Sequence, residues 1–138
     1  MLEKLQKLLG EEKVLMQEPM ASHTTFRIGG PADYFVMPET IEELTAVLKL
    51  CKEEQMPYFI LGNGSNLLVG DKGFRGVVIQ LYKNFDGFQI EGTKVTAKSG
   101  TMLIRVAKEA GKAVIIVINK WDLIDKDGKT TNSFYYNY

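Results

Sequence analysis

The fold is decided by residues 61–66, which read Leu61-Gly62-Asn63-Gly64-Ser65-Asn66. Glycine lets the backbone adopt positive φ and lets a ligand approach the main-chain N–H groups closely. Successive amides that point the same way suit a pyrophosphate, and serine and asparagine add side-chain donors. The stretch is neither a G-x-x-x-x-G-K-[ST] phosphate loop nor a G-x-G-x-x-G turn that opens a helix, because Leu67–Val69 reads as extended. Taken alone, the loop favours the alternative interpretation, a tight turn of ordinary turn-forming residues.

Strand and helix patterns precede this loop. Ala32–Met37 is rich in strand-forming residues and ends at a proline. Thr40 and Glu43 form a capping box, and the helix that they open carries an apolar face and ends before Pro57. Tyr58–Leu61 reads as the next strand. These segments predict a strand-helix-strand unit with a right-handed parallel crossover.

Further elements are predicted after the loop. Val77–Leu81 reads as a strand, and Phe88–Ile90 and Val95–Ala97 flank a turn and predict a hairpin. Met102–Ala110 predicts a helix with one apolar face that points inward, Leu103 included. Residues 113–118 form a continuous apolar, mostly β-branched run and predict a buried strand near the C-terminus. The expected fold class is α/β or α+β, as one compact domain over residues 1–138.

Composition excludes several classes of protein. Among the 138 residues 45% are hydrophobic and 25% charged, and the formal net charge is zero, so a large basic surface for nucleic acid or an anionic membrane is absent. The longest apolar runs are too short to span a bilayer. The single cysteine, Cys51, suits a reducing compartment. His23, the one histidine, has no cluster of metal ligands around it. We therefore expect no nucleic-acid, membrane or metal partner, and the two family resemblances given below imply a cytoplasmic protein.

A series of motifs in a fixed order frames the glycine-rich loop. It consists of Ser22–Ala32, the capped helix, Leu61–Val69, Gly73–Ile79 and Val95–Gly100. From about residue 14 to residue 107, this series resembles the N-terminal FAD-binding part of the UDP-N-acetylenolpyruvoylglucosamine reductase family. Several ordered motifs are more specific than one glycine pattern, and they reverse the preference for an ordinary turn.

The resemblance implies the first part of a PCMH-type FAD-binding domain and an NADPH-dependent reduction in peptidoglycan synthesis. It implies FAD as the cofactor, with the pyrophosphate along the loop. The cofactor contacts that it implies are Gly62, Asn63, Gly64, Ser65 and Asn66, with Ser99 and Gly100 as weaker candidates.

Catalytic residues are not part of the resemblance. In the family, a proton-donating serine and a partner glutamate lie in later portions, and no residue of this sequence matches them. Hydride addition to a double bond needs an acid to complete it, so bound FAD alone would not give the reduction. We expect a truncated or chimeric FAD-binding fragment without reductase activity, and we assign no catalytic residue.

Residues 108–132 are similar to a different family, the tandem-domain ribosome-assembly GTPases. After the apolar run comes an N-K-x-D element, formed here by Asn119, Lys120 and Asp122, which in that family reads guanine. The sequence has no G-x-x-x-x-G-K-[ST] loop, on which GTP binding and hydrolysis depend. The alternatives are a chimera, an engineered or recombined scaffold without biochemical function, a natural truncated chain whose tail matches by chance, and residual guanine-nucleotide binding. Surfaces that larger parents buried would be exposed, which favours a homo-oligomer.

Overall fold

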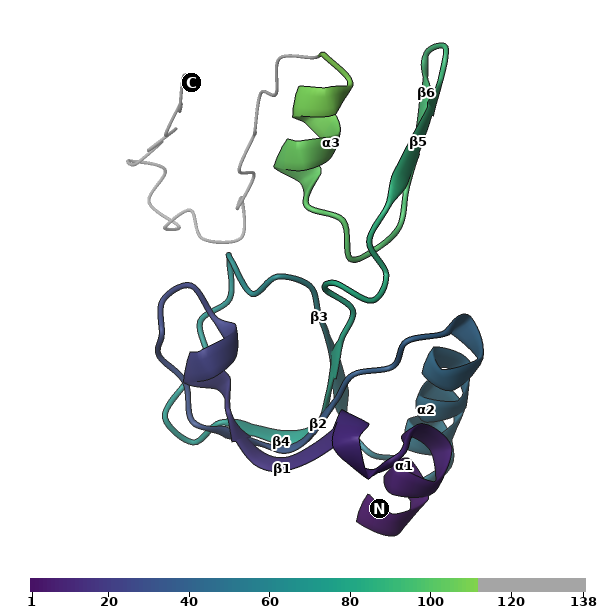
Figure 1. The fold of residues 1–138 in the computed structure, drawn as a ribbon. Coiled ribbons are helices and arrows are strands. Elements are labelled where there is room, and N and C mark those ends of the chain that lie inside the picture. The colour runs from purple at the N-terminus through teal and green to yellow at the C-terminus, as the bar shows by residue number, and fades with distance from the viewer. Residues whose placement is uncertain (112–138) are drawn as a thin grey trace, which may run out of the picture.

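A computed structural model describes residues 1–111 of the chain (Figure 1). The predicted strand at residues 113–118 and the guanine-binding candidates Asn119, Lys120 and Asp122 lie outside the described residues. In chain order the elements are α1 (Leu2–Leu9), η1 (Glu11–Lys13), β1 (Val14–Pro19), η2 (Met20–His23), β2 (Pro31–Val36), α2 (Ile41–Glu53), β3 (Tyr58–Leu61), β4 (Phe74–Gln80), β5 (Phe88–Glu91), β6 (Lys94–Ala97) and α3 (Leu103–Glu109).

Four strands form one sheet in the order β1-β2-β4-β3. β2 and β3 both pair with β4 in parallel, and β1 pairs with β2 antiparallel. The strand-helix-strand unit β2-α2-β3 is therefore present, with β4 lying between its two strands. The mixed sheet with helices confirms the predicted α/β or α+β class.

Helices α1 and α2 lie together on one face of this sheet (Figure 1). Their buried residues meet those of the sheet in one core, which includes Leu5, Val36, Val47, Val77 and Ile79, all without exposed surface. The predicted cap of α2 is confirmed, because the Thr40 hydroxyl accepts a hydrogen bond from the Glu43 N–H at 3.1 Å. One face of the sheet is thus fixed to two helices, and loops are left to cover the other.

The other face carries a smaller core formed by strand residues and loops. Phe35 and Val78 from the sheet pack with Met20 of η2, and Leu67 and Val69 of the loop after β3 lie against them. The predicted extended stretch Leu67–Val69 therefore helps to bury this face, although Leu68 itself is 68% exposed.

Main-chain contacts between glycines join two loops on this side of the sheet. The Gly30 and Gly73 N–H groups both donate to the Gly70 carbonyl oxygen, at 3.0 and 2.9 Å. A Cβ atom at Gly30 would overlap the Asp71 carbonyl, and one at Gly73 (φ 70) would overlap the Pro31 carbonyl. Only glycine allows the two backbone segments to approach this closely where β2 and β4 begin.

The predicted hairpin is confirmed as β5 and β6, and the predicted helix as α3. Both lie beyond the end of the sheet, away from α1 and α2 (Figure 1). The expectation that Leu103 points inward is wrong, because it is 67% exposed and only Val106 of α3 is buried. The apolar face of α3 finds little to pack against among residues 1–111.

None of the helices within residues 1–111 is long and apolar enough to cross a membrane.

Candidate functional site

The glycine-rich loop, residues 62–66, follows directly from β3 and rests on the segment after η2. The Thr25 N–H donates to the Gly64 carbonyl oxygen at 3.1 Å. Gly64 has φ 65, and a Cβ atom there would overlap the His23 carbonyl oxygen. Glycine is therefore required at this position by the fold itself. Sequence reasoning did not predict that residues 23–25 hold the loop in place.

The main-chain amides of this loop have no partner in the described protein. Within residues 1–111, no acceptor receives a hydrogen bond from the N–H of Asn63, Gly64, Ser65 or Asn66. Asn63, Ser65 and Asn66 are also exposed. Unpaired amides normally bond to water or to a ligand, so the loop has the donors that a pyrophosphate needs.

Gly62 differs from Gly64 in its surroundings. A Cβ atom at Gly62 would have no neighbour within 4 Å, and its φ is not in the left-handed region. Nothing in residues 1–111 therefore demands glycine here. Open space beside a glycine at the end of a parallel strand fits the close approach of a ligand, since ligands of such sheets bind beyond the carboxyl ends of the strands.

The structure brings Met102, which follows the second predicted segment Ser99–Gly100, into contact with this loop. The Asn63 side-chain amide lies 3.8 Å from the Met102 sulfur, three residues after Ser99. Ser99 is exposed. Gly100 is buried, and its N–H already donates to the Phe85 carbonyl oxygen at 3.0 Å. Any contact of Gly100 with a cofactor would therefore have to use other atoms.

The His23 side chain holds the segment on which the glycine-rich loop rests. Its ring stacks on Phe35 with centroids 4.0 Å apart, and its Nε2 lies 2.8 Å from Glu18 Oε1. Both contacts fix the segment on which Gly64 rests. No group of three or more His, Cys, Asp or Glu residues within residues 1–111 is arranged to hold a metal ion.

One ion pair, between Arg105 and Asp86, lies near the second segment. The hydrogen bond from Arg105 to Asp86 is the main reason that the pKa of the Asp86 carboxyl lies below its usual value. The Thr101 hydroxyl donates to the Gly87 carbonyl oxygen and accepts from the Gly87 N–H, each at 2.9 Å. These contacts tie the start of α3 to the base of the hairpin, so Ser99 and Gly100 lie on a fixed turn.

Residues 31–124 match the family model described as "FAD binding domain". The chain belongs to this FAD-binding domain family. The match runs from β2 past the end of α3 and includes the whole glycine-rich loop. It ends at residue 124, whereas the expected resemblance to an FAD-binding part ended near residue 107. The family confirms FAD as the cofactor predicted for this fold.

Curated relatives of this FAD-binding domain are reductases. The chain is 47% identical over 108 residues to the UDP-N-acetylenolpyruvoylglucosamine reductase of Alkaliphilus metalliredigens. The aligned part makes up 78% of this chain and 36% of that protein. It is 50% identical over 105 residues to the enzyme of the same name from Clostridioides difficile, covering 76% of this chain and 34% of that protein. The chain therefore spans about a third of the length of these relatives.

Solved structures agree on the fold. The reductase from Thermus caldophilus superposes with a TM-score of 0.52 at 35% identity, over 71% of this chain and 32% of that one. A p-cresol methylhydroxylase superposes with a TM-score of 0.58 at 20% identity, over 86% of this chain and 26% of that one. The second likeness shows the fold alone. Together they confirm a fold like that of PCMH-type FAD-binding domains.

Proposed function

We propose that this chain binds FAD and corresponds to the N-terminal flavin-binding part of a UDP-N-acetylenolpyruvoylglucosamine reductase of peptidoglycan synthesis. The observation that carries the proposal is the set of unpaired amides at Asn63–Asn66, next to the open space at Gly62. The likeness to the reductases covers this whole segment. The single cysteine suits the reducing cytoplasm, where we propose that the protein acts.

The residues of the loop would hold the pyrophosphate of FAD. The amides of Asn63, Gly64, Ser65 and Asn66 would donate hydrogen bonds to the phosphate oxygens, and the Ser65 and Asn66 side chains add further donors. The loop needs no large movement to bind, because Gly64 is already held by residues 23–25. Ser99 remains a predicted contact from the neighbouring turn.

We further propose that residues 1–138 do not reduce the substrate by themselves. Bound FAD supplies the hydride chemistry, and the protein must add a substrate site and a proton donor. The chain spans only 36% and 34% of two reductases that it resembles. The sequence resemblance supplies no counterpart of the family's proton-donating serine. Binding without turnover is the expected behaviour.

Titration of the purified chain with FAD tests the proposal. Quenching of flavin fluorescence gives the dissociation constant, and thermal unfolding gives an independent measure. FAD at a hundred times its dissociation constant should raise the free energy of unfolding by about 2.7 kcal/mol. If neither signal changes at millimolar FAD, the proposal fails and the interpretation as a scaffold without biochemical function gains support.

A pair of glycine variants locates the site. Gly62→Ala should fold normally, because its methyl group has space, yet should weaken FAD binding roughly tenfold by obstructing the phosphate. Gly70→Ala is the matched control, since Gly70 also lacks neighbours within 4 Å and a positive φ. Equal affinity of the two variants would place FAD away from the loop.

A titration with GTP and Mg²⁺ under the same conditions addresses the alternative, guanine-nucleotide binding. Because most of the affinity of GTP-binding proteins comes from the phosphates and the metal ion, we expect no stabilisation of this chain by GTP. A dose-dependent rise in melting temperature would support the alternative at Asn119, Lys120 and Asp122.

A further inference from the structure

The two outer strands of the described sheet differ in how they are protected against pairing with another chain. β1 contains Gln17, which has φ 49 and is absent from the pairs of the ladder although the register is the same on both sides of it, and the strand ends at Pro19. β3 contains no charged residue and no proline, and its side chains Tyr58, Phe59 and Ile60 are 48, 39 and 47% exposed. Edge strands of natural proteins are usually blunted by charge, proline or a bulge. β3 lacks all three.

Alternate residues of β3 turn their main-chain groups toward the edge that no other strand within residues 1–111 pairs with. The Pro57 carbonyl oxygen accepts a hydrogen bond from the Val77 N–H of β4 at 2.9 Å, and the Leu61 carbonyl oxygen accepts one from the Leu81 N–H, directly after β4, at 2.8 Å. Successive residues of a strand direct these groups to opposite sides, so Phe59 also faces β4. Tyr58 and Ile60 therefore present N–H and C=O groups to a further strand.

We propose that two copies of this chain associate by antiparallel pairing of their β3 strands about a two-fold axis. An axis through Phe59, perpendicular to the sheet, places Phe59 opposite Phe59 of the second copy and Tyr58 opposite Ile60. The outward main-chain groups of Tyr58 and Ile60 then bond to each other in both directions. Aromatic–aromatic and aromatic–β-branched pairs across strands are stabilising. The strand is thus complementary to itself, as a closed two-fold interface requires.

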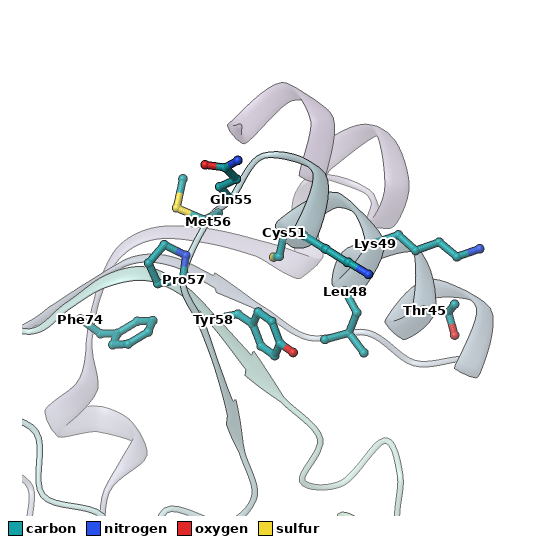
Figure 2. Close-up of a pocket in the computed structure, with 10 residues that line it drawn as sticks. Thr45, Leu48, Lys49, Cys51, Gln55, Met56, Pro57, Tyr58 and Phe74 are labelled. Atoms are coloured by element: carbon teal, nitrogen blue, oxygen red, sulfur yellow. The ribbon is translucent and has the colours of Figure 1, made fainter.

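Apolar hollows flank β3 on both faces of the sheet. On the helix side, a hollow of about 670 Å³ is lined by Tyr58, Phe74, Leu48 and Met56 among others (Figure 2). On the other side, a hollow of about 260 Å³ is lined by Phe59, Leu68 and Phe74 among others.

The hollows matter because of the area that an interface needs. A stable interface buries roughly 800 Å² on each partner, which is more than a four-residue strand offers. The hollows give the second copy apolar surface on both faces of the strand. The formal net charge of zero means that no overall repulsion opposes association of two copies.

Sedimentation velocity of the full chain over a wide concentration range tests the proposal, with two matched variants. Ile60→Lys puts a charge on the β3 edge at a side chain 47% exposed, and Met16→Lys does the same on the β1 edge at one 52% exposed. We expect a concentration-dependent dimer whose dissociation constant rises roughly tenfold or more in Ile60→Lys, because both Tyr58–Ile60 pairs are lost, and stays unchanged in Met16→Lys. Circular dichroism checks that both variants fold.

A single introduced cysteine reports the register. Phe59→Cys should form a disulfide-linked dimer under mild oxidation, because residue 59 lies opposite itself, whereas Ile60→Cys should cross-link far more slowly. Cys51 is 1% exposed and does not compete. A chain that stays monomeric at every concentration, for instance because another segment covers β3, overturns the proposal. So does a dimer that Met16→Lys disrupts and Ile60→Lys leaves intact.

Discussion

Replacing Gly64 with alanine should destabilise the fold while the same change at Gly62 should not. Gly64 has φ 65, where an alanine costs about 1–2 kcal/mol relative to glycine. The new methyl group would also overlap the His23 carbonyl oxygen, so either the loop or the segment at residues 23–25 must move. That movement breaks the hydrogen bond of 3.1 Å from the Thr25 N–H to the Gly64 carbonyl, which contributes about 1 kcal/mol.

Together these effects give a loss of about 2–3 kcal/mol for Gly64→Ala, a large fraction of the about 5–15 kcal/mol that holds a typical domain folded. At about 4 °C for each kcal/mol, the melting temperature should fall by about 10 °C. Gly62→Ala has open space and an ordinary φ, so we expect a change within about 0.5 kcal/mol.

Urea unfolding followed by far-ultraviolet circular dichroism measures both free energies without any ligand. The reasoning is refuted if Gly64→Ala is as stable as the native chain, or if the two variants lose equal stability. Either result would mean that residues 23–25 do not hold the loop as described.

Two further predictions concern the core and the pH dependence of stability. Phe35→Ala should cost about 3–5 kcal/mol because the ring has no exposed surface, whereas Phe26→Ala, at a ring 56% exposed, should change the melting temperature little. The Glu43 carboxyl has a pKa below its ordinary value of 4.5, mainly because it accepts the Glu39 N–H and also pairs with Lys13. Its stabilising effect is therefore complete above pH 4.5 and lost as the pH falls through the lowered pKa, so urea unfolding should show less acid destabilisation in Glu43→Gln than in the native chain.

Much of the fold could be predicted from local patterns in the sequence. The hydroxyl cap at Thr40 predicted α2, and the runs of strand-forming residues predicted β2, β3 and the β5–β6 hairpin, with small errors at the ends of the elements. β1 was missed, because its second half, Gln17–Pro19, reads as a turn rather than as a strand. Local patterns cannot reveal that Val14 pairs with Val36 and Leu15 with Phe35, far along the chain.

Tertiary contacts decided what sequence reasoning could not. An apolar helical face does not say what covers it, so the exposure of Leu103 was not foreseen. In the same way, the glycine pattern at residues 62–66 identified a candidate site but not the different roles of its glycines. The His23 carbonyl leaves no room for a side chain at Gly64, whereas a Cβ atom at Gly62 would meet nothing within 4 Å. This distinction depends on a segment about forty residues earlier in the chain.

The position of β4 has a consequence for the order of assembly during synthesis. β4 is the last of the four strands to be made, yet it is the strand that joins β2 to β3. A nascent chain that has not reached residue 74 holds β2 and β3 with no strand to connect them, and their apolar side chains stay accessible. The four-stranded sheet can therefore be completed only after β4 has been made, when it pairs with β2 on one side and β3 on the other.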